Sequence, residues 1–159
     1  MALADMPALQ SLSVSCKNVG DVGLSALPRF PALRELMPMD VPDEGYRHIG
    51  RCEQLESLVL MYCRDTTDDA TQRLVDLRNL KKYFASYNRI TDRTPEILSG
   101  IPSLEEIEFD SCAGLTNAGI AALTRLPRLH ELRLSGMPKV TDDIVAAAFA
   151  AHVRVRHSL

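Results

Sequence analysis

The sequence lacks a long apolar segment, an excess of basic residues and a recognisable leader. None of its apolar runs approaches the roughly 20 residues that a helix needs to cross a bilayer. Its first residues, MALADMPALQ, lack the positive start and continuous apolar core of a secretory signal. The formal net charge is -3, whereas nucleic-acid and anionic-membrane binders usually carry a basic excess. We therefore expect neither a nucleic acid nor a membrane as the partner.

Paired cysteines are lacking as well. The four cysteines, Cys16, Cys52, Cys63 and Cys112, include no CxxC pair, so a disulfide framework is not expected. A chain without disulfides fits a reducing compartment. We therefore expect a cytoplasmic, intracellular location.

Catalytic and cofactor motifs are absent from the sequence. It contains no GxSxG, no phosphate-binding loop, no HExxH and no GxGxxG. None of its four histidines stands in a recognisable motif with a serine or cysteine nucleophile. We therefore predict no catalytic residue, no cofactor and no metal. Scattered residues from separate strands can still assemble a site, so an enzyme stays the third alternative.

What the sequence does contain is one repeated phrase. The stretch Leu104–Ile120, LEEIEFDSCAGLTNAGI, returns in altered form at Leu55 and at Leu129. The repeat starts are 22 to 25 residues apart and fall at Leu9, Leu33, Leu55, Leu80, Leu104 and Leu129. A fixed period of this length is the mark of a solenoid, in which each repeat packs on its neighbours. We expect residues 1–159 to form a single domain of six such repeats.

The two halves of each repeat have different periods. In the first half apolar residues alternate with others, as in Ile107-x-Phe109, and this predicts a short strand with one face inward. In the second half they are three or four apart, as in Ile120 and Leu123, and this predicts a short helix. Successive strand–helix units make the strands parallel, and the wider helices curve the stack. We predict a right-handed α/β solenoid with a curved parallel sheet on its concave side and short helices on its convex side.

Short polar side chains mark where the helices begin. A threonine followed by aspartate or asparagine supplies an oxygen acceptor for the unpaired N–H groups of a helix start. Four repeats carry this pair, at Thr67-Asp68, Thr91-Asp92, Thr116-Asn117 and Thr141-Asp142. In the last repeat the helix is expected to include Ile144 and Val145.

The phrase LxxLxLxxC followed by (L/V/I)T(D/N)xG(L/I) resembles the cysteine-containing leucine-rich repeat, known from the C-terminal parts of F-box proteins and from bacterial proteins. The resemblance extends from Met6 to about Ala150. Cys63 and Cys112 match the cysteine place, and Cys16 matches it after a deletion of one residue. Asn88 supplies the alternative asparagine, while Asp40 or Val41 and Met137 depart from the pattern. Cysteines at this place are expected to be small buried residues at the strand ends.

The two ends differ in what they predict. The start, MALADMPAL, reads like the tail of a preceding repeat. Either Met1–Pro7 is a minimal cap or the chain is part of something longer, and the second is expected. Residues 150–159 contain Val153-x-Val155 and are expected to form a C-terminal edge strand or cap. Arg154 and Arg156 suit such an edge because charge discourages further strand pairing.

Residues at the third, fifth and seventh places of each repeat are expected to face outward from the sheet. Repeats two to four place an apolar patch there, and repeat five places three carboxylates that Arg133 and Lys82 partly neutralise. The predicted protein-binding residues are Met37, Met39, Val59, Met61, Phe84, Glu106, Glu108, Asp110 and Arg133. Pro38 stands at a place where other repeats bury leucine, and a proline inside a parallel ladder predicts a local break in the sheet between repeats one and three, beside Met37 and Met39.

An exposed apolar patch with a charged rim is typical of a protein-binding surface. We therefore predict a non-catalytic protein–protein interaction module that binds a protein or peptide, with apolar and basic side chains, on its concave face. The resemblance implies a recognition segment of a larger protein or complex. A patch covered by a terminal segment or by an oligomer contact is the other interpretation. A structural subunit that packs through its convex helical side is the alternative function.

Overall fold

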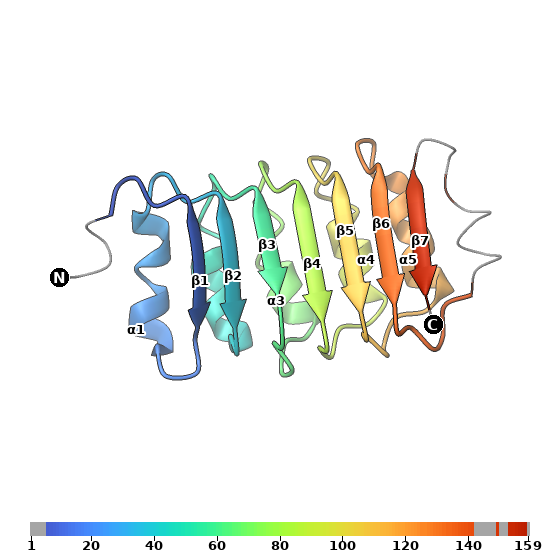
Figure 1. Ribbon diagram of the computed structural model, residues 1–159, viewed down its shortest axis with the longest axis horizontal. Helices are drawn as coiled ribbons and strands as arrows, with labels where there is room; N and C mark the ends of the chain where they lie inside the picture. Colours follow the sequence, from blue (N-terminus) through green and yellow to red (C-terminus); the bar gives the residue numbers. More distant parts are fainter. Residues whose placement is uncertain (1–5, 142–148, 150–152, 159) are drawn as a thin grey trace.

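The computed structural model describes residues 6–141, 149 and 153–158. Across this part of the chain, seven parallel strands form one sheet in the order in which they occur in the sequence (Figure 1). The strands are β1 (Ser11–Ser15), β2 (Glu35–Met39), β3 (Ser57–Leu60), β4 (Lys82–Ser86), β5 (Glu106–Asp110), β6 (Glu131–Ser135) and β7 (Arg154–Ser158). The predicted α/β architecture, with parallel strands and short helices, is confirmed.

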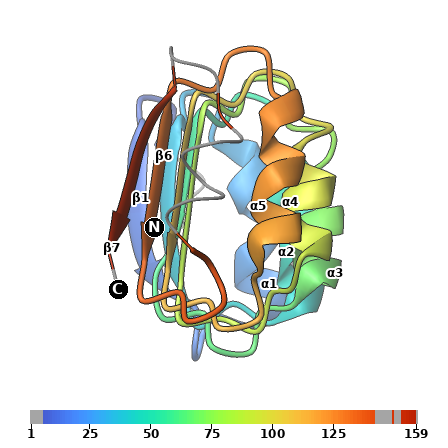
Figure 2. The same ribbon diagram turned by 90° about the vertical axis from the view of Figure 1, so that its right-hand side faces the viewer.

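The helices are short and all cover the same face of the sheet (Figure 2). They are α1 (Gly20–Leu24), α2 (Tyr46–Ile49), α3 (Asp68–Gln72), α4 (Arg93–Leu98) and α5 (Asn117–Ala122), with 3-10 turns η2 (Leu27–Arg29), η3 (Asp43–Gly45) and η4 (Leu123–Arg125). We call the other sheet face, the predicted concave one, the open face. The predicted helix residues Ile144 and Val145, and Met1–Asp5 of the predicted cap, lie outside the described residues.

The core lies between the sheet and the helices, and the repeat pattern accounts for it. In the fifth repeat Leu104, Ile107 and Phe109 are at most 1% exposed, because alternate strand residues point to the helix side. The strand register aligns these places, so that Tyr83 pairs with Ile107 and Ile107 with Leu132. One cluster of buried side chains therefore continues through successive repeats.

Pro38 interrupts the sheet on one side only. β1 and β2 pair over five residues, whereas β2 and β3 pair only at Glu35–Ser57 and Leu36–Leu58. Proline has no N–H to donate to a ladder, which is why it is normally confined to edges and bulges. The Pro38 carbonyl accepts a hydrogen bond from Cys63 Sγ at 3.4 Å. The predicted local break is present, but it separates β2 from β3 and leaves β1 fully paired.

Cys63 and Cys112, which follow β3 and β5, donate hydrogen bonds to carbonyls of the preceding strand. Cys112 Sγ donates to the Ala85 carbonyl at 3.4 Å, and Ala85 occupies the place in its strand that Pro38 occupies in β2. All four cysteines are buried, as predicted, and their thiols are free. Burial raises the pKa of Cys112 and of Cys52 to about 12. Such thiols are protonated and unreactive at neutral pH.

A column of threonine–aspartate hydrogen bonds joins consecutive repeats. Asp92 accepts from the Thr116 backbone N–H at 2.7 Å and from Thr116 Oγ1 at 2.6 Å. Asp68 accepts in the same way from Thr91, and Asp43 from Thr67. Thr116 Oγ1 in turn accepts from the Ala118 N–H at the start of α5. Each predicted capping threonine of these three repeats is thus held by the preceding repeat.

The first repeat departs from this column because Pro42, the next residue in line, has no N–H. Asp21 is bound instead by Arg47, at 2.7 Å, and by His48 Nε2, at 2.8 Å. The hydrogen bond from His48 holds the pKa of the Asp21 carboxyl below its usual value. A charged contact therefore replaces the threonine pairing between the first two repeats.

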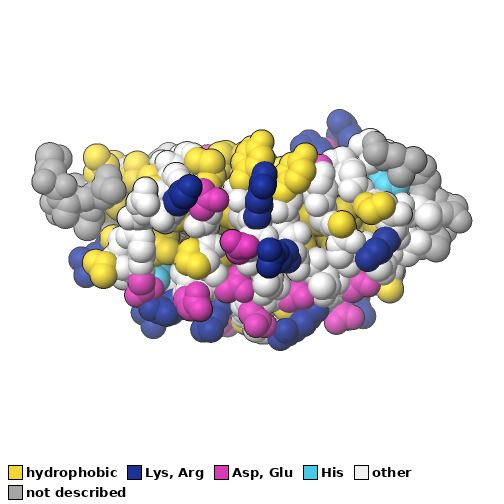
Figure 3. Space-filling model, turned by 90° about the horizontal axis from the view of Figure 1, so that it is seen from below, with side chains coloured by type: hydrophobic (Ala, Val, Ile, Leu, Met, Phe, Trp, Pro, Cys, Tyr) yellow, Lys and Arg dark blue, Asp and Glu magenta, His cyan; other side chains and the backbone are white. Residues whose placement is uncertain are grey.

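The surface mixes charges of both signs. Seen from the side to which the strands point, Asp, Glu, Lys and Arg side chains alternate along the lower edge, while hydrophobic side chains gather in the middle of the upper edge (Figure 3). Among the described residues, no helix has the length and apolar character needed to cross a membrane.

The Asp92–Thr116 pairing predicts a large effect of one substitution. Asp92→Ala removes the acceptor for two donors and leaves a partly buried backbone N–H unpaired, which should cost about 2–3 kcal/mol of unfolding free energy. Asp92→Asn should retain most of the stability, since Asn117 accepts from the Thr141 N–H at 2.9 Å at the equivalent place. Urea denaturation measures both variants, with the exposed Asp76→Ala as control. A midpoint for Asp92→Ala equal to that of Asp76→Ala would contradict the role of this column.

Candidate functional site

The predicted binding residues lie along the open face on five consecutive strands or just after them. Met37 and Met39 are on β2, Val59 on β3, Phe84 on β4 and Arg133 on β6, while Glu106, Glu108 and Asp110 are on β5. Met61 directly follows β3. The cross-strand register is the predicted one, with Val59 beside Phe84, Phe84 beside Glu108 and Glu108 beside Arg133.

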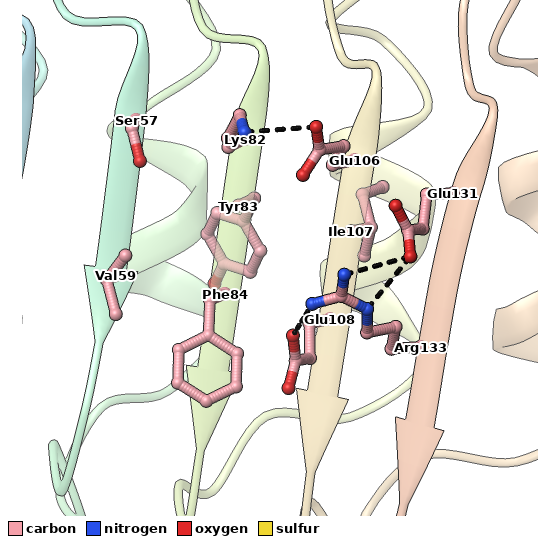
Figure 4. Close-up of a pocket in the computed structure, with 10 residues that line it drawn as sticks. All are labelled: Ser57, Val59, Lys82, Tyr83, Phe84, Glu106, Ile107, Glu108, Glu131 and Arg133. Atoms are coloured by element: carbon pink, nitrogen blue, oxygen red, sulfur yellow. Dashed lines mark hydrogen bonds and ion pairs between the residues drawn. The ribbon is translucent and has the colours of Figure 1, made fainter. Parts of the chain in front are cut away.

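A shallow hollow of about 210 Å³ lies in the open face (Figure 4). Its apolar side is formed by Val59 and the Phe84 ring, and its polar side by charged groups of β4 to β6. Five predicted residues line it, namely Val59, Phe84, Glu106, Glu108 and Arg133. Ser57, Lys82, Tyr83, Ile107 and Glu131 complete the lining. Met37, Met39, Met61 and Asp110 are not part of this hollow.

The apolar residues of the open face are only partly covered. Met37 is 36% exposed, and Val59, Met61 and Phe84 are half-buried. The strand alternation explains this exposure, because the same strands bury Leu58, Leu60 and Tyr83 on the helix side. The patch therefore consists of side chains that the fold itself does not require to be apolar.

Ion pairs within the chain neutralise most of the charge beside the hollow. Lys82 Nζ lies 3.0 Å from Glu106 Oε1. The Arg133 guanidinium lies 3.2 Å from Glu108 and 2.9 Å from Glu131 (Figure 4). The hydrogen bond from Arg133 holds the pKa of Glu131 below its usual value. Asp110 differs, because its partners are the uncharged hydroxyls of Ser135, at 2.8 Å, and Ser111, at 3.0 Å.

Two tyrosines that the sequence pattern did not single out lie beyond the carboxyl ends of two central strands. Tyr62 and Tyr87 follow β3 and β4, and their rings stack with centroids 5.9 Å apart and planes 8° apart. They are 48% and 49% exposed, which makes them the most exposed aromatic side chains of the described residues. Both belong to the eighth place of their repeats, outside the alternation that identifies the open face.

The backbone at this eighth place is left-handed. The φ angles are 56° at Tyr62 and 53° at Tyr87, and repeats two, five and six have Asp40, Ser111 and Gly136 there with similar angles. In the left-handed region a Cβ atom crowds the backbone, at a conformational cost of roughly 1–2 kcal/mol per residue. Gly avoids this cost because it has no Cβ, and Asn and Asp tolerate the conformation better than other residues. Two bulky aromatic residues are therefore unfavourable choices for the fold at this place. Strained residues of this kind often mark functional positions.

Among the described residues, side chains of the types that bind metals are not brought together. In the described ranges no cluster of three or more His, Cys, Asp or Glu side chains is arranged to hold a metal ion. His48 binds Asp21 between helices of the first two repeats, away from the open face. The open face therefore offers apolar contact and paired charges rather than a reacting group.

The Arg133–Glu131 contact gives a pH-dependent prediction. Arg133→Met should raise the pKa of Glu131 towards the ordinary glutamate value of about 4.3, though incompletely, because Arg156 remains 4.0 Å away. A carboxyl whose pKa is lowered by folding stabilises the protein above its unfolded pKa, and this contribution is lost as the pH falls through its folded pKa. The difference in unfolding free energy between wild type and variant should thus shrink in acid. NMR titration of the carboxyl carbon measures the pKa, with Arg78→Met as control, and an unchanged Glu131 pKa would refute the assignment.

Comparisons with known proteins give distant sequence relatives. No family model matches the chain. Mitochondrial ATP synthase subunit s from Rattus norvegicus is 29% identical over 102 residues, which are 64% of this chain and 41% of the relative. The Homo sapiens protein of the same name is 31% identical over 98 residues, 62% of this chain and 39% of the relative. The chain spans about two fifths of the length of these curated relatives.

Solved structures match over nearly the whole chain. An internalin (InlF) from Listeria monocytogenes covers 96% of this chain, with 48% of its own chain aligned, at a TM-score of 0.55 and 17% identity. TLR13 in its complex with ssRNA13 covers 92% of this chain, with 28% of its own chain aligned, at a TM-score of 0.55 and 19% identity. At such identities the likeness shows the fold alone. The chain has the α/β leucine-rich-repeat fold that its sequence predicts.

Proposed function

We propose that the chain is a non-catalytic protein-binding module that takes its partner on the open face. The observation that carries the proposal is the apolar patch of Met37, Met39, Val59, Met61 and Phe84, left uncovered in the described structure. Burial of such a patch is the usual driving force of protein association. Methionine side chains add adaptability, since they adjust to irregular partner surfaces.

The charges on the open face refine the partner. Lys82 and Arg133 already bind Glu106 and Glu108, so these two carboxylates attract a basic partner less strongly than an unpaired carboxylate does. Glu35 and Asp110, in contrast, make no ion pair among the described residues. Basic side chains of the partner are expected to meet these two carboxylates, while apolar side chains fill the hollow beside Phe84.

A protein fits the open face better than a nucleic acid does. Nucleic-acid binding is dominated by basic side chains that neutralise phosphates. The open face carries carboxylates on β2, β5 and β6, and the net charge of the chain is -3. The complex with single-stranded RNA is a complex of TLR13, and binding of RNA is a property of that protein.

A second candidate is a structural subunit that packs into an assembly through its helical side. The name of the sequence relatives, ATP synthase subunit s, favours this candidate because it describes a member of a complex. Membership in a larger protein or complex is common to both candidates. They differ in the surface that is used.

We also propose a cellular compartment and a leucine-rich-repeat subtype for the chain. A cytoplasmic location rests on the free, buried cysteines, whereas the sequence relatives are named mitochondrial. A fluorescent fusion that accumulates in mitochondria would overturn the cytoplasmic proposal. The cysteine-containing subtype, with its link to F-box proteins, is supported by the shared contact of Cys63 and Cys112 with the preceding strand.

The open-face proposal is tested by charge. Met61→Glu and Phe84→Glu should each abolish binding, because a carboxylate cannot be buried against an apolar partner without a large desolvation cost. Unfolding midpoints should stay close to wild type, since both side chains are partly exposed. Affinity capture from cells, quantified by mass spectrometry, compares the two variants with wild type. Val22→Glu, at an 86% exposed position of α1, is the matched control, and partners retained equally by all four proteins would disprove the use of the open face.

The helical-side candidate makes the opposite prediction. Arg93→Glu reverses a charge on α4 that pairs with Asp69 at 3.0 Å, and it should release the chain from an assembly that packs on the helices. Phe84→Glu should then have no effect. Co-sedimentation of each variant with the assembly distinguishes the two surfaces, because only one variant is expected to dissociate.

A further inference from the structure

Two neighbouring repeats carry the same short motif, which the fold does not need. Tyr62 is followed after one residue by Arg64, and Tyr87 after one residue by Arg89. The equivalent pairs of places hold Asp40 and Pro42 in repeat two, Ser111 and Ala113 in repeat five, and Gly136 and Pro138 in repeat six. The tyrosine–arginine motif therefore occurs only where its two copies lie side by side.

The structure turns the two copies into one surface, which we call the tyrosine ledge and define as Tyr62, Arg64, Tyr87, Asn88 and Arg89. The stacked rings form its apolar part. A shallow depression beside them is lined by Arg64, Tyr87, Asn88, Arg89 and Ser111, among others. It lies on the side of the molecule to which the strands point, where hydrophobic side chains gather with Lys and Arg next to them (Figure 3).

The hydrogen-bond donors of Arg64, Asn88 and Arg89 have weak acceptors or none among the described residues. Arg64 is exposed and makes no ion pair among the described residues. Arg89 lies 3.5 Å from Asp65, but the two side chains are 74% and 83% exposed, so this contact is weak. Asn88 is 8% exposed, and its Nδ2 has no hydrogen-bond partner within the described structure, while its Oδ1 accepts from Cys112 Sγ. A buried amide donor without a partner is rare and calls for an explanation.

We propose that the tyrosine ledge binds an acidic segment of a partner protein, with a carboxylate at Arg64 and Asn88 and an apolar or aromatic side chain against the tyrosine rings. Guanidinium groups bind carboxylates through charge-assisted hydrogen bonds. Tyrosine and arginine are the residues enriched at the energetic centres of protein interfaces. Tyrosine at this left-handed place, an unfavourable choice for the fold, is then retained for recognition rather than for folding.

A single-stranded nucleic acid is less compatible with the ledge. Such strands bind by stacking bases on aromatic rings along a basic groove. Here the two rings stack on each other with planes 8° apart, so each has only one face left. Asp40 and Asp65 line a depression together with Arg64, and Asp65 lies 3.5 Å from Arg89, so carboxylates stand beside both arginines of the ledge.

The ledge is separate from the hollow beside Phe84, and its proposal does not depend on that of the open face. None of its five residues lines that hollow. The expected partner chemistry also differs, since the open face is expected to receive basic side chains and the ledge acidic ones.

A displayed library of random peptides tests the proposal. Peptides are selected on the wild-type chain and counter-selected on the Tyr62→Ser/Tyr87→Ser double variant. Serine is chosen because Ser111 occupies the same place with a φ of 54°, so the fold should be retained, as an unfolding midpoint equal to or above that of wild type would show. The recovered peptides should carry Asp or Glu next to an aromatic or aliphatic residue.

Synthetic copies of the recovered peptides then separate the contributions. In fluorescence anisotropy, Arg64→Glu should weaken binding by about tenfold or more, whereas Arg78→Glu, the same charge change at an exposed position of the turn before β4, and Phe84→Ala should not. The proposal is overturned if no peptide survives counter-selection, if the survivors lack acidic residues, or if Arg64→Glu and Arg78→Glu act alike. It is also overturned if oligo(U) binds wild type and is released by the tyrosine variant, which would make the ledge a nucleic-acid site.

Discussion

The burial of leucine-sized side chains against neighbouring repeats is the constraint on which the rest of this structure depends. A strand of four or five residues with a single helical turn cannot cover its own apolar face, so each repeat is folded only in contact with the next. Leu55, Leu80 and Leu104, at the start of successive repeats, are fully buried. The hydrogen bonds of the Thr–Asp column act within this frame, because they set where each helix begins relative to the preceding one.

The sequence predicts this frame well because it is periodic. Places one, four and six of each repeat are apolar for the same physical reason in every repeat, so single departures do not obscure the pattern. The row Val59, Phe84, Glu108, Arg133 follows directly from the strand alternation, whereas the burial of Cys63 and Cys112 follows from their shared place in the repeat pattern. What a repeat pattern predicts is thus the average repeat, including which residues point outward.

Features that belong to one repeat could not be predicted in the same way. Pro38 indicates a break, but only the structure shows that β3 loses the pairing while β1 keeps it. The left-handed backbone of Tyr62 and Tyr87 is also hidden, because Asp, Ser and Gly at the same place in other repeats give no common signal. The pairing of Arg133 with two carboxylates depends on rotamers that sequence spacing does not determine.

The Thr–Asp column has a direction, and this bears on how the length of such a chain can change. In the described repeats from the third to the fifth, the threonine donates backward and the following Asp or Asn accepts from the next repeat. A segment that begins and ends at equivalent places can therefore be gained or lost with every donor still matched to an acceptor. A deletion that begins and ends at unequal places of two repeats separates a threonine N–H from its carboxylate acceptor and leaves both without their partner. The fold thus tolerates growth and shortening in whole repeats, and variation in length should occur in those steps.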